Sequence, residues 1–291
     1  MEPSITGRLL GLQARVARPF WGLMGAWSVL CGALASNGLR AQGEDLLTLA
    51  LVLLLADVAW GTLWDLAAGT DWLGSLATDW PPRRPGGLRG LPYTQRRAPA
   101  GRLLRSTNRL AGWWRESFWP QAGGALLGLL AAALLAAVLT LLLPVALRPL
   151  NAIVVALLGL GVAARRHGRE LLAGEALASV GLGWLAGHLA FAPAEGTSVL
   201  LALCLAVAAW GGLRLAGGLR GALLPLNGGQ VAAIALLAAV KQPLPAGLLG
   251  LLLLGQIALQ PSLGEAEPAI VARRTWPWLM AAMLVAALAV P

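Results

Sequence analysis

The chain has 291 residues, of which 58% are hydrophobic and only 12% are charged, and its formal net charge is +9. Soluble globular domains carry about 25% charged residues, so this composition excludes an ordinary soluble protein and predicts a polytopic membrane protein. The basic residues stand between apolar runs and do not gather on one polar domain, which argues against nucleic acid as a partner.

Nine apolar segments are candidates for membrane-spanning helices, since one crossing needs about 20 apolar residues. They lie at 19–36, 44–68, 121–143, 149–164, 171–192, 198–213, 221–240, 244–260 and 276–290. Glycine and alanine fill these segments, and such small residues let transmembrane helices pack closely. We therefore expect one all-α bundle over residues 1–291, with an interfacial N-terminus at 1–18 and a long basic loop at 73–118.

The distribution of basic residues tests this number of spans, because a wrong number would scatter them over both sides of the membrane. Of the 22 Lys and Arg residues, only Arg40, Arg148 and Lys241 fall on the side opposite to the others. Positive charge accumulates on the cytoplasmic side. We therefore expect the N-terminus and the 73–118 loop in the cytoplasm and the C-terminus outside, in a bacterial inner membrane.

Acidic residues mark the second apolar segment. Asp57 falls near its middle, where a costly ionisable side chain indicates either a functional group or a hydrogen-bonded structural aspartate. Asp65 and Asp71 fall at its cytoplasmic end, where carboxylates either hold magnesium in diphosphate chemistry or carry ordinary helix-end charge. All three are candidate catalytic residues, and Asp65 and Asp71 are the candidate metal ligands if the chain is an enzyme.

His188 lies in a tryptophan- and glycine-rich segment and admits two interpretations. A neutral imidazole ligates the magnesium of a chlorin pigment in one of them. In the other, His188 is a core histidine that is hydrogen-bonded to a neighbouring helix. A lone histidine carries little information, so we favour the second interpretation.

Three short motifs resemble the UbiA superfamily of intramembrane prenyltransferases. Arg18-Pro19-Phe20 is similar to the Arg-Pro that opens the family's first helix. The segment TQRRAPAGRLLRS is similar to the family's T-x-x-R-P-x-P-x-G loop, and ARRHGRELLAGEALASVGLG resembles the basic start of its fifth helix. The resemblance implies the family's nine-helix bundle with a cytoplasmic N-terminus.

The resemblance also implies an apolar chamber beside the second segment. Asp57, Trp60, Trp64 and the small residues of the fifth segment would border it, and the two tryptophans would offer flat faces to a ring. Together with His188 and with Arg97 of the motif loop, Trp60 and Trp64 are the candidate binding residues for a quinone, a chlorin or an isoprenoid lipid.

The family's metal-binding carboxylates are mostly missing. If Asp65 occupies the third polar position of N-D-x-x-D-x-x-x-D, then Gly61, Thr62 and Gly69 occupy the others. The stretch 206–224, where a second aspartate motif should stand, contains no acidic residue. Magnesium bound to a diphosphate needs several oxygen ligands. We therefore expect that metal-dependent catalysis has been lost.

The expected function is that of an accessory or structural subunit that binds isoprenoid, quinone, pigment or lipid. Its partners would be membrane lipids and other membrane protein subunits. The alternative is an active prenyltransferase that attaches an isoprenoid chain to an aromatic or chlorin acceptor, and only this alternative requires Mg²⁺ as a cofactor.

Overall fold

The computed structural model describes residues 23–70, 72, 99–165, 171–219, 221–260 and 268–290, and every regular element within these ranges is a helix. In chain order the elements are α3 (Leu23–Ala35), α4 (Gly43–Leu53), η1 (Leu54–Trp60), α5 (Gly61–Gly69), α7 (Pro99–Trp113), η2 (Trp114–Phe118), α8 (Trp119–Leu142), η3 (Val145–Leu147), α9 (Arg148–Arg165), α10 (Leu172–Ala176), η4 (Leu177–Gly181), α11 (Leu182–Leu189), α12 (Gly196–Ala216), α13 (Leu223–Ala239), α14 (Pro243–Leu259) and α15 (Pro268–Ala289). The segments η1, η2 and η4 are π-helical, and η3 is a 3-10 turn.

Elements that follow one another without a break form nine helical segments within the described ranges. This confirms the predicted all-α architecture, and the nine helical segments equal in number the nine predicted from the sequence. Four stretches are long and apolar enough to cross a membrane, which indicates a multi-pass membrane protein: Gly43–Ala67, Ser106–Leu142, Val145–Arg165 and Gly196–Ala216. Three further helices are apolar but shorter: Leu23–Ala35, Leu223–Ala239 and Pro243–Leu259.

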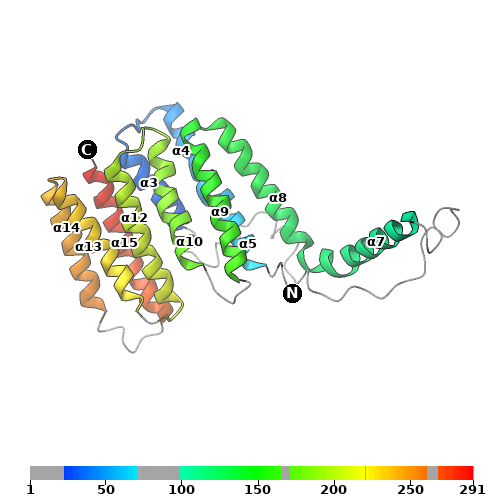
Figure 1. Ribbon diagram of the computed structural model, residues 1–291. Coiled ribbons are helices and arrows are strands. Elements are labelled where there is room, and N and C mark those ends of the chain that lie inside the picture. Colours follow the sequence, from blue (N-terminus) through cyan, green and yellow to red (C-terminus); the bar gives the residue numbers. More distant parts are fainter. Residues whose placement is uncertain are drawn as a thin grey trace.

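Residues 99–118 are helical, although the sequence predicts a loop there. α7 and η2 continue directly into α8, so one unbroken helical segment runs from Pro99 to Leu142. Figure 1 shows α7 running sideways from the lower end of α8, away from the other helices. The loop prediction depended on low hydropathy, which does not detect a helix with one basic and one apolar side. The N-terminus at 1–18 and residues 73–98 of this predicted loop lie outside the described residues.

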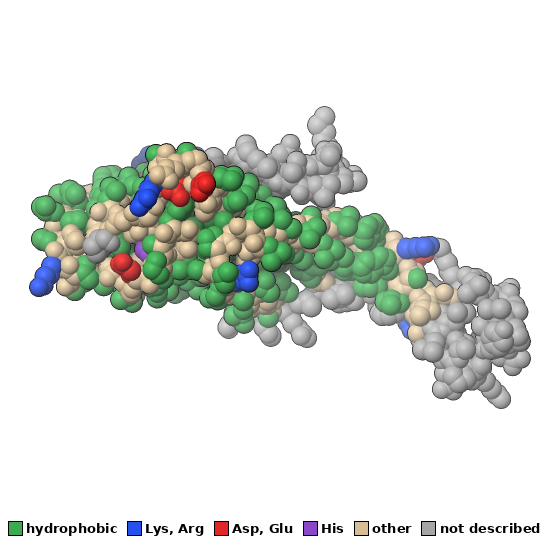
Figure 2. Space-filling model, turned by 90° about the horizontal axis from the view of Figure 1, so that it is seen from above, with side chains coloured by type: hydrophobic (Ala, Val, Ile, Leu, Met, Phe, Trp, Pro, Cys, Tyr) green, Lys and Arg blue, Asp and Glu red, His purple; other side chains and the backbone are tan. Residues whose placement is uncertain are grey.

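α8 and α9 leave most of their apolar side chains on the outside of the bundle. In the most apolar stretch of Ser106–Leu142, 22% is buried, and in that of Val145–Arg165, 17% is buried. The corresponding share in Gly196–Ala216 is 44%. Figure 2, which views one end of the bundle from above, shows hydrophobic side chains around much of its rim. So large an apolar surface requires lipid or another apolar surface against it.

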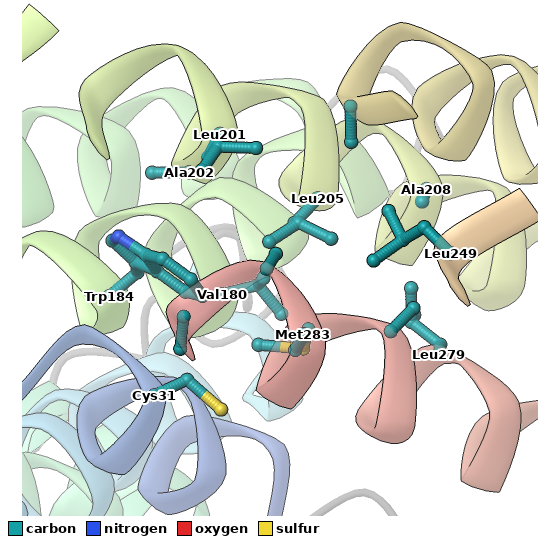
Figure 3. Packing of buried hydrophobic residues seen from close by; sticks show 14 of the residues in the cluster. Cys31, Val180, Trp184, Leu201, Ala202, Leu205, Ala208, Leu249, Leu279 and Met283 are labelled. Carbon is teal, nitrogen blue, oxygen red and sulfur yellow. The ribbon is translucent and has the colours of Figure 1, made fainter. Parts of the chain in front are cut away.

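The buried residues form two main clusters that meet at α3 and α11. The larger cluster joins α3 and α11 to α12, α13, α14 and α15, and Figure 3 shows Cys31, Trp184 and Met283 packed where α3, α11 and α15 converge. The smaller cluster joins α3 and α11 to α4, η1, α5, α8 and α9. We call α12–α15 the C-terminal half and α4–α9 the N-terminal half of the bundle.

Glycine lets α3 and α11 approach closely enough to serve both halves. A Cβ on Gly32 would lie 1.9 Å from the Trp184 carbonyl oxygen, and a Cβ on Gly187 would lie 2.0 Å from the Val29 carbonyl oxygen. Any side chain at either position would force the helices apart, because membrane helices rely on this close packing. The α3–α11 pair is therefore the common axis of the bundle.

Candidate functional site

Asp57, Trp60 and Trp64 lie on one continuous helix that changes its geometry at this point. The helix widens from α4 into the seven-residue π-helical segment η1, in which Asp57 is the central residue, and returns to α-helix at Gly61. π-helical turns inside α-helices occur frequently at functional sites. We call Asp57, Trp60, Trp64 and the residues that they contact the span-two site.

Asp57 is half-buried and points toward α3. One of its carboxylate oxygens, Oδ1, lies 3.4 Å from the position that a Cβ on Gly25 would occupy, and its Cα lies 3.8 Å from that position. Glycine at position 25 thus gives the carboxylate access to the α3 backbone. Asp57 lies inside the bundle and does not face the lipid, as expected for an ionisable residue within a membrane span.

A second π-helical segment, η4, contacts η1. The Ser28 hydroxyl of α3 lies 2.7 Å from the Ser179 carbonyl oxygen of η4 and 2.8 Å from the Gly25 carbonyl oxygen. The Ser179 hydroxyl in turn donates to the Glu175 carbonyl oxygen at 2.8 Å. Gly25 is therefore close to both Asp57 and Ser28. Polar groups of α3, η1 and η4 thus lie near one another within an otherwise apolar interior.

Trp60 is 3% exposed and belongs to a hydrogen-bonded chain that ties η1 to α9 and α8. Its indole nitrogen donates to Asn151 Oδ1 at 2.5 Å. The Asn151 amide nitrogen donates to the Thr140 hydroxyl, and that hydroxyl donates to the Ala136 carbonyl oxygen at 2.5 Å. The polar edge of Trp60 is thus engaged within the protein, so Trp60 offers a ligand only the remainder of its ring.

Trp64 lies one helical turn after Trp60 and packs against both α9 and α10. The ring carbon Cη2 lies 3.1 Å from the position of a Cβ on Gly174 and 4.0 Å from that of a Cβ on Gly161. The predicted neighbourhood of Trp64 and the small residues of the fifth apolar segment is therefore present, with Gly174 as the contacting residue. The ring itself is 9% exposed.

The candidate catalytic carboxylates do not share one environment. Asp65 lies on α5, eight residues after Asp57 and exposed, whereas Asp57 is half-buried. Asp71 and Arg97 lie outside the described residues. Within the part of the chain that the structure describes, no three or more His, Cys, Asp or Glu side chains are grouped closely enough to hold a metal ion.

Both ring nitrogens of His188 take part in hydrogen bonds. Nε2 lies 3.1 Å from the Pro193 carbonyl oxygen and must donate to it, so Nδ1 accepts from the Ser198 hydroxyl at 3.1 Å. That hydroxyl also accepts from the Trp184 indole nitrogen at 2.9 Å. This geometry is that of a core histidine bonded to the neighbouring helix α12. A chlorin magnesium would have to displace one of these bonds, and this role of His188 stays a prediction.

Four amide side chains join α13 to α14, and the sequence-based predictions do not include them. Asn227 and Gln260 exchange two hydrogen bonds, at 3.0 and 3.3 Å. The Gln256 amide nitrogen donates to Asn227 Oδ1 at 3.2 Å, and Gln256 Oε1 accepts from the Gln230 amide nitrogen at 3.0 Å. We call Asn227, Gln230, Gln256 and Gln260 the amide quartet. Their spacing, i and i+3 in one helix and i and i+4 in the other, would have indicated two facing polar edges.

The candidate ligand site at span two therefore stays a prediction, and in the described part of the chain two polar clusters, around His188 and at the amide quartet, join neighbouring helices. No protein-family model, no curated protein and no solved structure matches this chain. The resemblance to the UbiA superfamily accordingly stays a prediction from its sequence motifs.

Proposed function

We propose that this chain is a UbiA-like membrane protein without metal-dependent catalysis that binds a lipophilic molecule at the span-two site, as an accessory or structural subunit of a membrane assembly. The observation that supports the proposal is the half-buried Asp57 in the π-helical segment η1, which contacts the second π-helical segment η4 and is followed on the same helix by Trp60 and Trp64. An ionisable group inside a membrane bundle is a functional hypothesis by default.

The chemistry of the site defines the class of ligand. The carboxylate of Asp57 accepts a hydrogen bond from a hydroxyl or ring nitrogen of a polar head, in an interior where such bonds are not diluted by water. The apolar surroundings of Trp64 suit an isoprenoid tail, since each CH₂ that leaves water contributes about 0.8 kcal/mol. A quinol, an isoprenoid alcohol or a pigment with such a tail combines both features.

The arrangement of acidic residues supports a binding function over the alternative of prenyl transfer. Asp57 and Asp65 differ in exposure and lie eight residues apart, and 206–224 contains no acid. A magnesium-bound diphosphate needs several carboxylates around each metal. The alternative, transfer of an isoprenoid chain to an aromatic or chlorin acceptor with Mg²⁺ on Asp65 and Asp71, depends on Asp71, which lies outside the described residues.

Orientation in the membrane forms part of the proposal. We place the N-terminus in the cytoplasm and the C-terminus outside, in a bacterial inner membrane. Arg40, Arg148 and Lys241 belong to one end of the bundle, whereas Arg115, Arg165 and other arginines belong to the opposite end, which the positive-inside rule assigns to the cytoplasm. A reporter fusion near Arg97 that signals outside, or one at the C-terminus that signals inside, would contradict this orientation.

The experiment that tests the binding function is lipid extraction and mass spectrometry of the purified full-length protein. We expect one lipophile to be retained by the wild type and lost from Asp57→Asn and from Trp64→Ala. Trp278→Ala is the matched control, because Trp278 packs on Gly255 at the α14–α15 contact, far from span two in the fold. Equal recovery from all variants would refute the proposed site.

Catalysis is tested separately by incubating the same protein with prenyl diphosphates and magnesium. We expect no transfer to aromatic acceptors. Turnover that Asp65→Asn abolishes would establish the prenyltransferase alternative instead.

A further inference from the structure

α7 leaves the bundle at the point where α8 begins. The helix extends over fifteen residues, Pro99–Trp113, and contacts η2 at its C-terminal end. Figures 1 and 2 both show it beyond the packed helices. The side chains from Ser106 to Ala111 are all exposed, and Leu110 is 49% exposed. The apolar side chain of Leu110 thus lies on the surface of α7, whereas Trp113 at the end of the helix is buried in a small cluster with Phe118 and Ala122.

The spacing of the sequence assigns basic and apolar positions to opposite sides of α7. Positions 102, 105 and 109 are all arginine in the sequence, and their spacing of three and four residues places them on one side of an α-helix. Leucine at 103, 104 and 110 and alanine at 111 fall on the other side by the same rule. A helix with one cationic and one apolar side is typical of segments that lie in the membrane–water interface.

Aromatic side chains mark the junction of α7 with the membrane-spanning part of α8. Trp114 stacks on Phe118 with ring centroids 4.7 Å apart, and Trp114 and Trp119 lie 6.0 Å apart. Trp114 and Trp119 are both exposed, at 39% and 43%. Exposed tryptophan at the end of a membrane span prefers the level of the lipid headgroups. α7 therefore starts from the headgroup level and continues sideways from it.

We propose that α7 lies along the cytoplasmic membrane surface and binds anionic lipid headgroups through Arg102, Arg105 and Arg109, with its leucine side toward the acyl chains. The proposal rests on the membrane orientation given above and is independent of any ligand at span two. Charge complementarity selects this occupant, because each arginine near an anionic bilayer strengthens binding about fivefold. A protein partner or a second copy of the chain would give different outcomes below.

The test measures the position of α7 in the full-length protein in nanodiscs. Leu110→Cys carries an environment-sensitive fluorophore on the apolar side, and Asn108→Cys, two residues away, carries it on the opposite side. Both are made with Cys204→Ala, whereas Cys31 stays because it is only 1% exposed and inaccessible to a polar reagent. Bilayers of phosphatidylcholine alone are compared with bilayers that also contain phosphatidylglycerol.

We expect the label at 110, but not at 108, to be shielded from an aqueous quencher in the anionic bilayer. Replacing the arginines by glutamine (R102Q, R105Q, R109Q) should shift the equilibrium toward the exposed label about fivefold for each arginine removed. Replacing them by lysine keeps the charge and should preserve shielding.

Three outcomes would overturn the proposal. Equal exposure of both labels in both bilayers would show that α7 stands free of the surface. Shielding that does not depend on phosphatidylglycerol or on the arginines would show that headgroup charge is not recognised. Shielding that depends on the number of protein copies per disc would assign the apolar side to a second copy.

Discussion

α12 in the C-terminal half and α8 and α9 in the N-terminal half are similarly apolar, but they bury their residues to very different extents. The C-terminal half packs its helices on each other: a Cβ on Gly211 would lie 2.2 Å from the Leu226 backbone nitrogen, and one on Gly229 would lie 2.5 Å from the Cys204 carbonyl oxygen. In the N-terminal half, α9 leaves Ile153, Val155 and Leu160 on the outside. α12 is therefore held closely by α13, whereas α8 and α9 depend on what surrounds them, as does the side of α14 that exposes Leu244, Leu251 and Leu254.

Polar contacts differ between the halves in the same way. The amide quartet joins α13 and α14 through four reciprocal side chains, with Gln230 and Gln256 fully buried. In the N-terminal half, a hydrogen-bonded chain through Trp60, Asn151 and Thr140 connects η1, α9 and α8. Membrane helices lack a hydrophobic force between them, so close packing and such polar bonds determine their association. We therefore predict that the C-terminal half is the more rigid one and that the N-terminal half unfolds first.

The largest effect is expected from filling a close contact in the C-terminal half. Gly229→Val should destabilise the protein by about 3 kcal/mol or more, because the side chain meets the α12 backbone and not a flexible side chain. Gly228→Val, one residue earlier in the same helix, meets nothing within 4 Å and should be tolerated. Detergent-induced unfolding of the two variants gives the comparison. Similar losses at both positions would show that α12 and α13 do not pack as described.

An intermediate effect is expected from the amide quartet. Gln256→Leu removes the side-chain partner of Gln230 and one of the two partners of Asn227, and should lower the free energy of unfolding by about 1 to 2 kcal/mol. Adding Gln230→Leu should cost less than the sum of the two single changes, because both buried partners are then apolar. Strict additivity in this double-mutant cycle would show that the two amides do not interact.

The smallest effect separates the two halves directly. Trp60→Phe should cost about 1 kcal/mol, because the Asn151 acceptor loses its donor. Trp27→Phe removes a comparable indole bond, 3.0 Å to the Met280 carbonyl oxygen, and serves as the control. Hydrogen exchange over α9 should accelerate in the first variant and not in the second. Acceleration in both, or in neither, would mean that Trp60 does not hold α9 in place.

Hydropathy predicts the helices well where a segment is uniformly apolar. The segment predicted at 149–164 is helical over Arg148–Arg165, and the one predicted at 221–240 is helical over Leu223–Ala239. It fails at the start of α15, which begins at Pro268 and continues through Pro277. The sequence-based prediction starts this segment at 276, because the charged residues Arg273 and Arg274 interrupt the apolar run before it. Helices continue past a membrane boundary, so hydropathy alone does not find their ends.

The candidate site is only partly predictable. Asp57 is recognisable because a lone acid interrupts an apolar run, and His188 because histidine is rare in this chain. The π-helical geometry of η1 and the hydrogen bond from Trp60 to Asn151, 91 residues away, depend on neighbours that only the folded bundle supplies. Asparagine and glutamine carry no charge, so a search of the sequence for ionisable groups does not find the amide quartet.

The contacts between α3 and α15 bear on how the protein is made. Trp27 bonds to Met280 and Asn37 to Val290, and each pair is separated by 253 residues. At about 5 to 20 residues per second, synthesis of the intervening chain takes roughly 10 to 50 seconds. α3 thus enters the bilayer long before the helix that completes its packing exists, and its backbone-exposing glycines must be shielded during that interval. Insertion machinery or early pairing with α11 has to protect α3 until the synthesis of α15 is complete.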